Sequence, residues 1–304
     1  MVANRFLIPL LLLFVCTLSG TGCATTPYHY GQFLSIGRQD SPTSKVEIVY
    51  GRTHTGLDRL AWVVGLPSRI LPLHASVNNH SLSDESAEKL TKYLEDNELT
   101  DVYVRVNQYD PAGEWQRLRG NKRIAPGWRY SVGAMGLIVY AILPGRVFGG
   151  DLYNPYTNSL YINSDVPAVV LAEAAYAKDI HARQLPGAYA TINEIPLLSL
   201  WRHVNAVNDV LSYARTQEDW GLERETYRVV YPQMGVHAAG GGHTIATLLT
   251  AMPVFTIPLV ALGGAVAGHS VGQTMIAKWE AKLSHQSPIE RVDEEIQTTG
   301  YAEP

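Results

Sequence analysis

The residues most suggestive of chemistry lie on two predicted helices in the middle of the chain. Ala172 and Tyr176 are spaced by four, so they share one helix face, and Glu173 directly follows the first of them. On the later helix, Asn205 and Asp209 are also spaced by four. Two histidines at that spacing with an adjacent glutamate bind zinc and activate its water, and a carboxylate from a following helix can complete the ligand set. This chain has the glutamate and the later acid, and has no imidazole at either ligand position.

The pattern resembles a gluzincin-type zinc metallopeptidase over roughly residues 153–214. The H-E-x-x-H segment reads Ala172-Glu173-Ala174-Ala175-Tyr176, and the later E-x-x-x-D segment reads Asn205-Ala206-Val207-Asn208-Asp209. An Asn-Pro-Tyr-Thr-Asn strand before the motif also resembles uncharacterised bacterial envelope proteins in which the motif is intact. The resemblance implies a zincin-like helical half with degenerate ligand positions Ala172, Tyr176 and Asn205, a relic general base Glu173 and a relic supporting acid Asp209.

Loss of all three ligands predicts that this site holds no metal and that the protein uses no cofactor. Alanine cannot coordinate zinc, and a phenol with a pKa near ~10 stays protonated at neutral pH. Two alternatives remain open. In one, the segment is an ordinary alanine-rich helix with Glu173 and Lys178 in solvent; in the other, Glu173 works without zinc beside Asp179 or Asp209.

Other residues that could do chemistry match no template. His181, His203, His237, His243 and His269 have no metal-ligand spacing, so they are expected to be surface or loop histidines. The glycine run at 240–242 is not followed by Lys-Ser/Thr, and no G-x-S-x-G element occurs, so neither a phosphate loop nor a serine hydrolase elbow is indicated.

The N-terminal segment predicts export and lipid attachment. One positive charge precedes an apolar run from Phe6 to Val15, which is interrupted by Pro9 and is too short to span a bilayer. Small residues then lead to Cys23, which resembles a bacterial lipobox, although Gly20 stands where an aliphatic residue is usual. The alternatives are an ordinary signal peptide with an incidental cysteine and a retained membrane helix. Cys16 lies in the apolar run, so the mature chain would have one cysteine, acylated, and no disulfide.

Composition and length argue against a nucleic-acid-binding protein and limit the number of domains. Hydrophobic residues make up 46% of the chain and charged residues only 17%, with a net charge of −4, which gives no electrostatic footprint for nucleic acid. About 280 residues would remain after cleavage, which is enough for one large domain or two modest ones.

Hydrophobic periodicity predicts an α+β fold with a small mixed sheet, a zincin-like helical half and an apolar, glycine-rich helical hairpin. Ser83 is expected to cap a helix ending near Asn97, and Asp165 or Ser164 a helix over 166–183. Residues 101–107 are expected to form a half-buried strand with Arg105 outward. The predicted strands are 45–50, 101–107 and, within 149–162, a strand and a turn that lead into an edge strand. The predicted helices are 57–66, 84–97, 114–119, 133–143, 166–183, 196–215 and 222–231. The predicted organisation is a signal peptide (1–22), a tether (23–44), an α+β body (45–232), an apolar segment (233–283) and a polar tail (284–304).

The apolar segment lies in a stretch, 229–277, that contains no Asp, Glu, Lys or Arg. Gly264, Gly268 and Gly272 are spaced by four, which gives a flat helix face that another backbone can approach. Pro253 and Pro258 favour two short helices or a re-entrant hairpin over one clean membrane span. Both membrane contact and burial as a hairpin in a soluble core fit this pattern.

These observations predict an exported protein, anchored to membrane lipid through acylated Cys23 and located in the outer membrane facing the periplasm. Its body is expected to be a catalytically inactive metallopeptidase-like scaffold with a structural or interaction role. Two alternatives remain: an envelope hydrolase that uses Glu173 with a non-standard site, and a membrane-inserting assembly protein that self-associates or binds a partner through the glycine-spaced helix.

Overall fold

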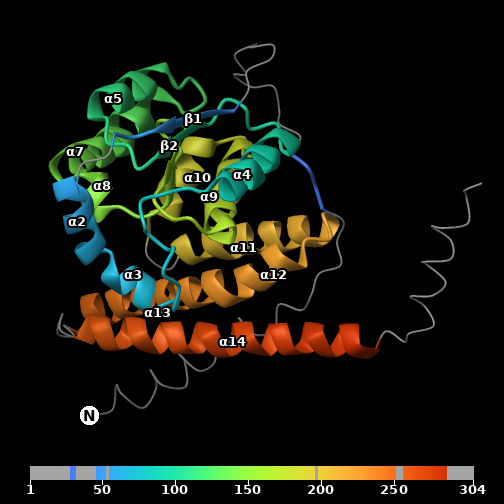
Figure 1. Cartoon of the computed structure of the whole chain (residues 1–304). Helices are drawn as coiled ribbons and strands as arrows, with labels where there is room; N and C mark the ends of the chain where they lie inside the picture. The colour runs from blue at the N-terminus through green and yellow to red at the C-terminus, as the bar shows by residue number, and fades with distance from the viewer. Residues whose placement is uncertain (1–27, 32–45, 53–54, 196–197, 251–255, 286–304) are drawn as a thin grey trace, which may run out of the picture.

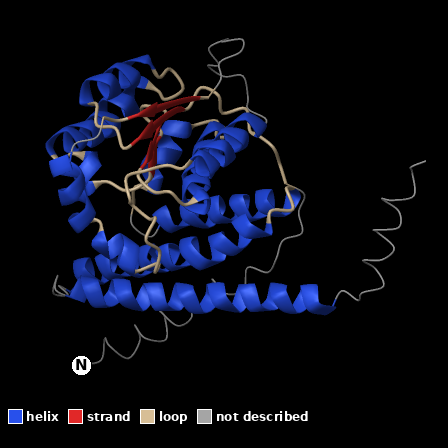
Figure 2. Ribbon diagram, viewed as in Figure 1, coloured by secondary structure: helices blue, strands red, loops and turns tan. Residues whose placement is uncertain are grey.

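The computed structural model describes residues 28–31, 46–52, 55–195, 198–250 and 256–285. They form an α+β fold in which a small sheet is covered by helices on both faces, with a layer of long helices on one side (Figures 1 and 2). The predicted fold class is confirmed, including the small mixed sheet and the C-terminal helical hairpin. The predicted signal peptide and Cys23 lie outside the described residues, as does the predicted tail beyond His285.

The sheet has the strand order β1-β2-β4-β3 and is mixed. β1 (Glu47–Tyr50), β2 (Tyr103–Val106) and β4 (Ser159–Ile162) are parallel, and β3 (Leu152–Asn154) runs antiparallel to β4. The strand, turn and strand predicted within 149–162 are confirmed as β3 and β4. The prediction that the second strand lies at the edge is wrong, because β4 is a central strand that is buried at every position. The short hairpin turns β4 inward and leaves β3 at the edge.

Helices cover the two faces of the sheet differently. Val104 and Ile162 on one face belong to the main core, which they share with α9 (Pro167–His181) and α4 (Asp84–Asp96). On the other face Arg105 is only 2% exposed, and its Nε donates to Glu114 of α5 (Pro111–Gly120) at 2.6 Å. The prediction that Arg105 points to solvent is wrong, because α5 covers that face.

The remaining helices and π-helical turns follow the chain in this order: α2 (Thr55–Val64), α3 (Leu66–Ile70), α6 (Pro126–Trp128), η1 (Arg129–Gly133), α7 (Ala134–Ile142), α8 (Gly145–Phe148), α10 (Pro186–Asn193), α11 (Ser199–Thr216), α12 (Trp220–Glu225), η3 (Thr226–Val230), α13 (Tyr231–Thr250) and α14 (Ile257–His285). The glycine run at 240–242, expected in a loop, lies inside α13.

Helix capping agrees with the sequence at one position and differs at another. The Ser83 side chain accepts a hydrogen bond from the Ser86 backbone N–H, which confirms the predicted cap of α4. The predicted cap of α9 is wrong: Asp165 accepts hydrogen bonds from Ser83 and Ser86 instead. A distant helix satisfies the start of α9, since Glu225, the last residue of α12, accepts from the Ala168 N–H at 2.8 Å.

The glycine-spaced face of α14 packs inside the chain. A Cβ added at Gly264 would lie 2.3 Å from the Gly235 carbonyl oxygen of α13, and one at Gly272 would lie 2.1 Å from the Tyr227 carbonyl oxygen of η3. At Gly268 the added atom would lie 2.3 Å from the Tyr231 carbonyl oxygen. The glycines therefore allow close antiparallel packing of α14 on α13 and η3, and this face is already occupied by the chain itself. α14 also has 29 residues, so the expectation of two short helices is wrong for the second one.

Candidate functional site

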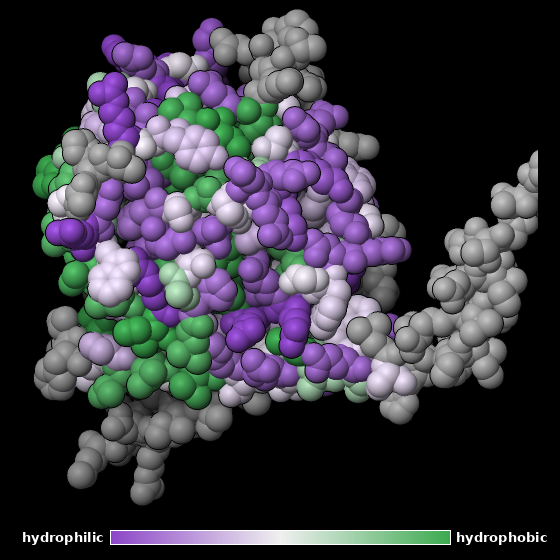
Figure 3. All heavy atoms as spheres, in the orientation of Figure 1, coloured by the Kyte–Doolittle hydropathy of each residue, from purple (hydrophilic) through white to green (hydrophobic). Residues whose placement is uncertain are grey.

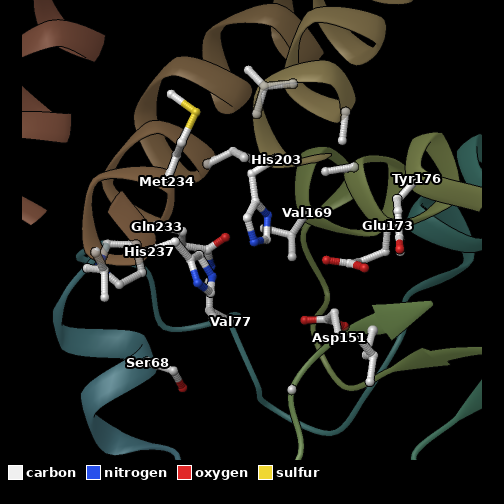
Figure 4. Close-up of a pocket in the computed structure, with 18 of the residues that line it drawn as sticks. Ser68, Val77, Asp151, Val169, Glu173, Tyr176, His203, Gln233, Met234 and His237 are labelled. Carbon is white, nitrogen blue, oxygen red and sulfur yellow. The ribbon is translucent and has the colours of Figure 1, made fainter. Parts of the chain in front are cut away.

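A cavity of about 500 Å³ gathers the residues of the metallopeptidase-like motif with residues that the motif did not include. Its wall on α9 is formed by Val169, Ala172, Glu173 and Tyr176. Other walls come from α3 and the loop after it, β3, α11, η3 and α13. The close-up shows the Glu173 and Asp151 carboxylates pointing into the space that is also lined by two histidine rings (Figure 4). The additional polar lining residues are Ser68, Asn78, Asp151, Arg202, His203, Gln233 and His237.

Glu173 is held by the backbone of the edge strand. Its Oε2 accepts a hydrogen bond from the Tyr153 N–H at 3.0 Å, so the alternative that Glu173 is simply solvated is wrong. Burial raises the pKa of the Glu173 carboxyl, while the positive charge of Arg202 and the Tyr153 N–H act in the opposite direction. The carboxylate is therefore fixed by protein groups, with one oxygen tied to β3.

Arg202 links the acid to the residue at the second ligand position. Burial alone would lower the pKa of Arg202, but the nearby Glu173 carboxylate and Tyr176 phenol raise it more. The Arg202 guanidinium carbon lies 4.8 Å from the centre of the Tyr176 ring, which is a cation–π arrangement. Burial raises the pKa of Tyr176, so its phenol stays protonated at neutral pH. Arg202 also lines a neighbouring cavity of about 430 Å³ on the side of η1 and α7.

His203 and His237 form a stacked pair. Their ring centres lie 4.2 Å apart with an interplanar angle of 18°. Burial lowers the pKa of both imidazoles, and the charge of Arg202 adds to this effect; the neighbouring His237 ring lowers the pKa of His203 further. Both rings are therefore neutral at pH 7. Since stacked rings direct their in-plane lone pairs alongside one another, the two nitrogens do not converge on one ion.

Asp151 is the second acid of the cavity. Its Oδ1 accepts from the Asn163 and Ser164 backbone N–H groups at 2.8 and 3.0 Å, and its Oδ2 accepts from the Ser164 hydroxyl. Burial raises the pKa of Asp151 against these hydrogen bonds. Among the described residues, no group of three or more His, Cys, Asp or Glu side chains is arranged to hold a metal ion.

The predicted third-ligand helix presents a different face to the cavity. Arg202, His203, Ala206 and Val207 of α11 line it. At 100° per residue, Asn205 lies roughly 130° around the helix from the centre of that face. Ala206, four residues after Arg202, therefore stands closer to Ala172 and Tyr176 than the position identified from sequence.

Asp209 lies in a separate cluster. Its Oδ1 accepts from Lys178 Nζ at 2.6 Å, and its Oδ2 accepts from the hydroxyls of Tyr93 and Tyr28 at 2.5 and 3.3 Å. Lys178 also lies 3.9 Å from the centre of the Tyr28 ring, so Lys178, like Glu173, is not simply solvated. Tyr28 belongs to the predicted tether, and this cluster fixes it to α4, α9 and α11. Asp209 thus holds the start of the folded body and is not directed at Glu173.

Neither acid proposed as a zinc-free companion of Glu173 lines the cavity. Asp179 pairs with Arg183 and accepts from the Tyr189 hydroxyl at 2.6 Å, on a separate surface. The only serine among the lining residues, Ser68, donates to the Gly65 carbonyl at 2.7 Å. The lining residues therefore offer acid, base and cation groups without an activated nucleophile.

His203 was expected on the surface or in a loop but is half-buried in α11, whereas His237 is exposed, as expected, and lies in α13 and not in a loop. They are separated by 34 positions and come from different helices, so no spacing rule could connect them. Comparison with known proteins finds no matching family model, no matching curated protein and no matching solved structure. The gluzincin resemblance therefore remains a prediction from sequence.

Proposed function

We propose that this chain is an exported, lipid-anchored cell-envelope protein whose body is a non-hydrolytic, metallopeptidase-like scaffold with a structural or interaction role. Membrane lipid, through acylated Cys23, is its first partner, and the outer membrane facing the periplasm is its proposed location. Nucleic acid is not a proposed partner, because the net charge is −4.

The surroundings of Glu173 support the non-hydrolytic role most directly. A general base in a zinc hydrolase needs a metal-bound water, whose pKa the metal lowers to about 7. Here the neighbouring groups on α9 are Ala172 and Tyr176, and Glu173 itself is tied to the Tyr153 N–H at 3.0 Å and lies in the field of Arg202. This arrangement stabilises a carboxylate within a wall, and α9 supplies no imidazole beside it to hold a water-activating metal.

A zinc-free hydrolase is a second candidate, favoured by one observation. Glu173 and the neutral His203 line the same cavity, so a carboxylate and an imidazole of different basicity face one ligand space. General acid–base catalysis uses such pairs. In this candidate His203 takes the place of Asp179 and Asp209 as the companion of Glu173, because neither acid lines the cavity.

Metal analysis of the purified protein with a peptidase assay tests the proposal. We expect no stoichiometric zinc and no peptide cleavage from the wild-type chain. A matched Ala172→His, Tyr176→His double variant supplies two imidazoles on the same cavity wall and serves as the positive control for metal uptake. About one tightly held zinc per wild-type chain would contradict the proposal.

The lipid anchor needs its own test. Mass spectrometry of the mature N-terminus should show a diacylglyceryl or triacyl modification on Cys23, and Cys23→Ser should abolish it. A mature chain that begins elsewhere, or carries an unmodified Cys23, would remove the anchor from the proposal.

A further inference from the structure

The outer face of α14 is apolar over its first half and uncharged up to residue 277. Leu259, Leu262 and Val266 are 71%, 53% and 56% exposed, and none of the exposed residues from 257 to 277 is charged. At 1.5 Å per residue this uncharged face is about 30 Å long. The space-filling view shows a hydrophobic area at the lower left, where Figure 1 places the paired ends of α13 and α14 (Figure 3).

Exposed apolar side chains also lie on α3, the short helix beside α14. Ile70 and Leu73, at the end of α3 and just after it, are exposed, and the His269 Nε2 of α14 donates to the Leu71 carbonyl at 2.9 Å. We call Ile70, Leu73, Leu259, Leu262 and Val266 the apolar face.

α14 is long and apolar enough to cross a membrane by length and composition, but its other side is attached to the polar body. Near its C-terminal end, the Trp279 indole N–H donates to the buried Glu223 carboxylate, which also pairs with Arg215. A spanning orientation would carry this charged pair toward the hydrocarbon, where charges are costly. The geometry therefore favours a helix that lies along a membrane surface.

We propose that the apolar face rests in the membrane, with α14 lying in the plane of the bilayer and its exposed aliphatic side chains among the acyl chains. This contact is a second attachment, independent of the lipid on Cys23. An uncharged face of this length suits acyl chains better than a soluble protein partner, whose interfaces carry polar rims. Lys278 and Lys282 begin where the face ends, so their ammonium groups can reach lipid phosphates.

The start of the described chain limits how far the bilayer can lie from the helices. Tyr28 is packed against Tyr213 of α11, with ring centres 5.3 Å apart, and Cys23 lies five residues earlier. Five residues span at most about 17 Å, so a lipid on Cys23 would keep the bilayer within reach of the C-terminal half of α11, which packs on α13 of the α13–α14 hairpin.

Polarity-sensitive labels on full-length, lipidated protein in phosphatidylethanolamine–phosphatidylglycerol vesicles test this contact. The reporter Leu262→Cys places the label on the apolar face. The matched control Leu185→Cys replaces a leucine that is 74% exposed at the start of α10, outside that face. Acyl-brominated lipid should quench and blue-shift the label at position 262, and should leave the label at 185 as in water. Adding Leu259→Lys to the reporter variant should weaken the quenching at 262. A lysine in place of a leucine near the acyl chains should lower the partition of the apolar face into the membrane by roughly tenfold.

Three outcomes separate the possibilities. Equal, water-like signals at 262 and 185 would overturn the membrane contact. A label at 262 that is shielded from water but not quenched by brominated lipid would also overturn it, because a second copy or a protein partner would then cover the face. If the thiol label also reacts with the wild-type chain, Cys23 is free and the lipid anchor is removed from the proposed function. The comparison of 262 with 185 would still decide the membrane contact. Circular dichroism of each variant checks that the fold is kept.

Discussion

Replacing Gly268 with alanine should weaken the packing of α14 on α13 and lower the free energy of unfolding. The added methyl would lie 2.3 Å from the Tyr231 carbonyl oxygen and 2.6 Å from Pro232 Cα. These are backbone atoms, which cannot move aside without displacing a helix, so overpacking should cost about 1–3 kcal/mol of unfolding free energy. The helix-propensity gain of about 1 kcal/mol for Gly→Ala partly offsets this cost.

Gly263→Ala is the matched control on the same helix, because an added Cβ there meets nothing within 4 Å. It gains the same propensity without the clash, so the difference between the two variants isolates the packing term of about 1–3 kcal/mol. Urea unfolding of both variants in detergent micelles, followed by circular dichroism, measures that difference. Equal stabilities would refute the close packing of α14 on α13 and η3.

Three further perturbations test the electrostatics of the body. Glu114→Gln keeps an oxygen for Arg105 Nε but removes the buried carboxylate charge that neutralises the guanidinium, and should cost roughly 3–5 kcal/mol in a urea titration. Glu85→Gln on the surface should cost less than about 1 kcal/mol, and similar values for the two variants would contradict the buried pair. Burial lowers the pKa of His181 to about 3, so between pH 3 and 6.5 the unfolded chain binds more protons at this residue than the folded chain does. The free energy of unfolding should therefore fall as the pH drops below 6.5, by up to roughly 5 kcal/mol. His181→Asn should flatten the pH dependence of the melting temperature, and an unchanged slope would count against this assignment. Asp209→Asn should lower stability by about 1–3 kcal/mol and increase proteolysis near Tyr28, and normal protection there would argue against the cluster that fixes the chain start.

Local sequence rules succeeded where the interaction is local. The Ser83 cap and the existence of α9 and α11 could be predicted, because capping and periodicity depend on neighbouring residues. The close packing of Gly264 on Gly235 was anticipated only as a flat face, since its partner lies on another helix.

Non-local contacts explain what the sequence did not predict. Arg105 alternates with valines and looked solvent-exposed, but α5 covers that face and supplies Glu114. Asp165 stands before α9 yet accepts hydrogen bonds from Ser83 and Ser86 at the start of α4. His203 and His237 meet only because α11 and α13 pack together, so no spacing could reveal their stacked pair.

The most direct test of the non-hydrolytic scaffold is complementation of a deletion strain by Glu173→Gln. Glutamine keeps an oxygen that can accept from the Tyr153 N–H, so the fold should be retained with a stability change of no more than about 1 kcal/mol. The exposed Glu88→Gln on α4 is the matched control. The scaffold proposal predicts that both variants support the cellular phenotype as the wild type does. A Glu173→Gln protein that folds and reaches the membrane normally, yet fails to complement while Glu88→Gln succeeds, would contradict it, because loss of a general base costs about 10²–10⁴-fold in rate without changing the fold.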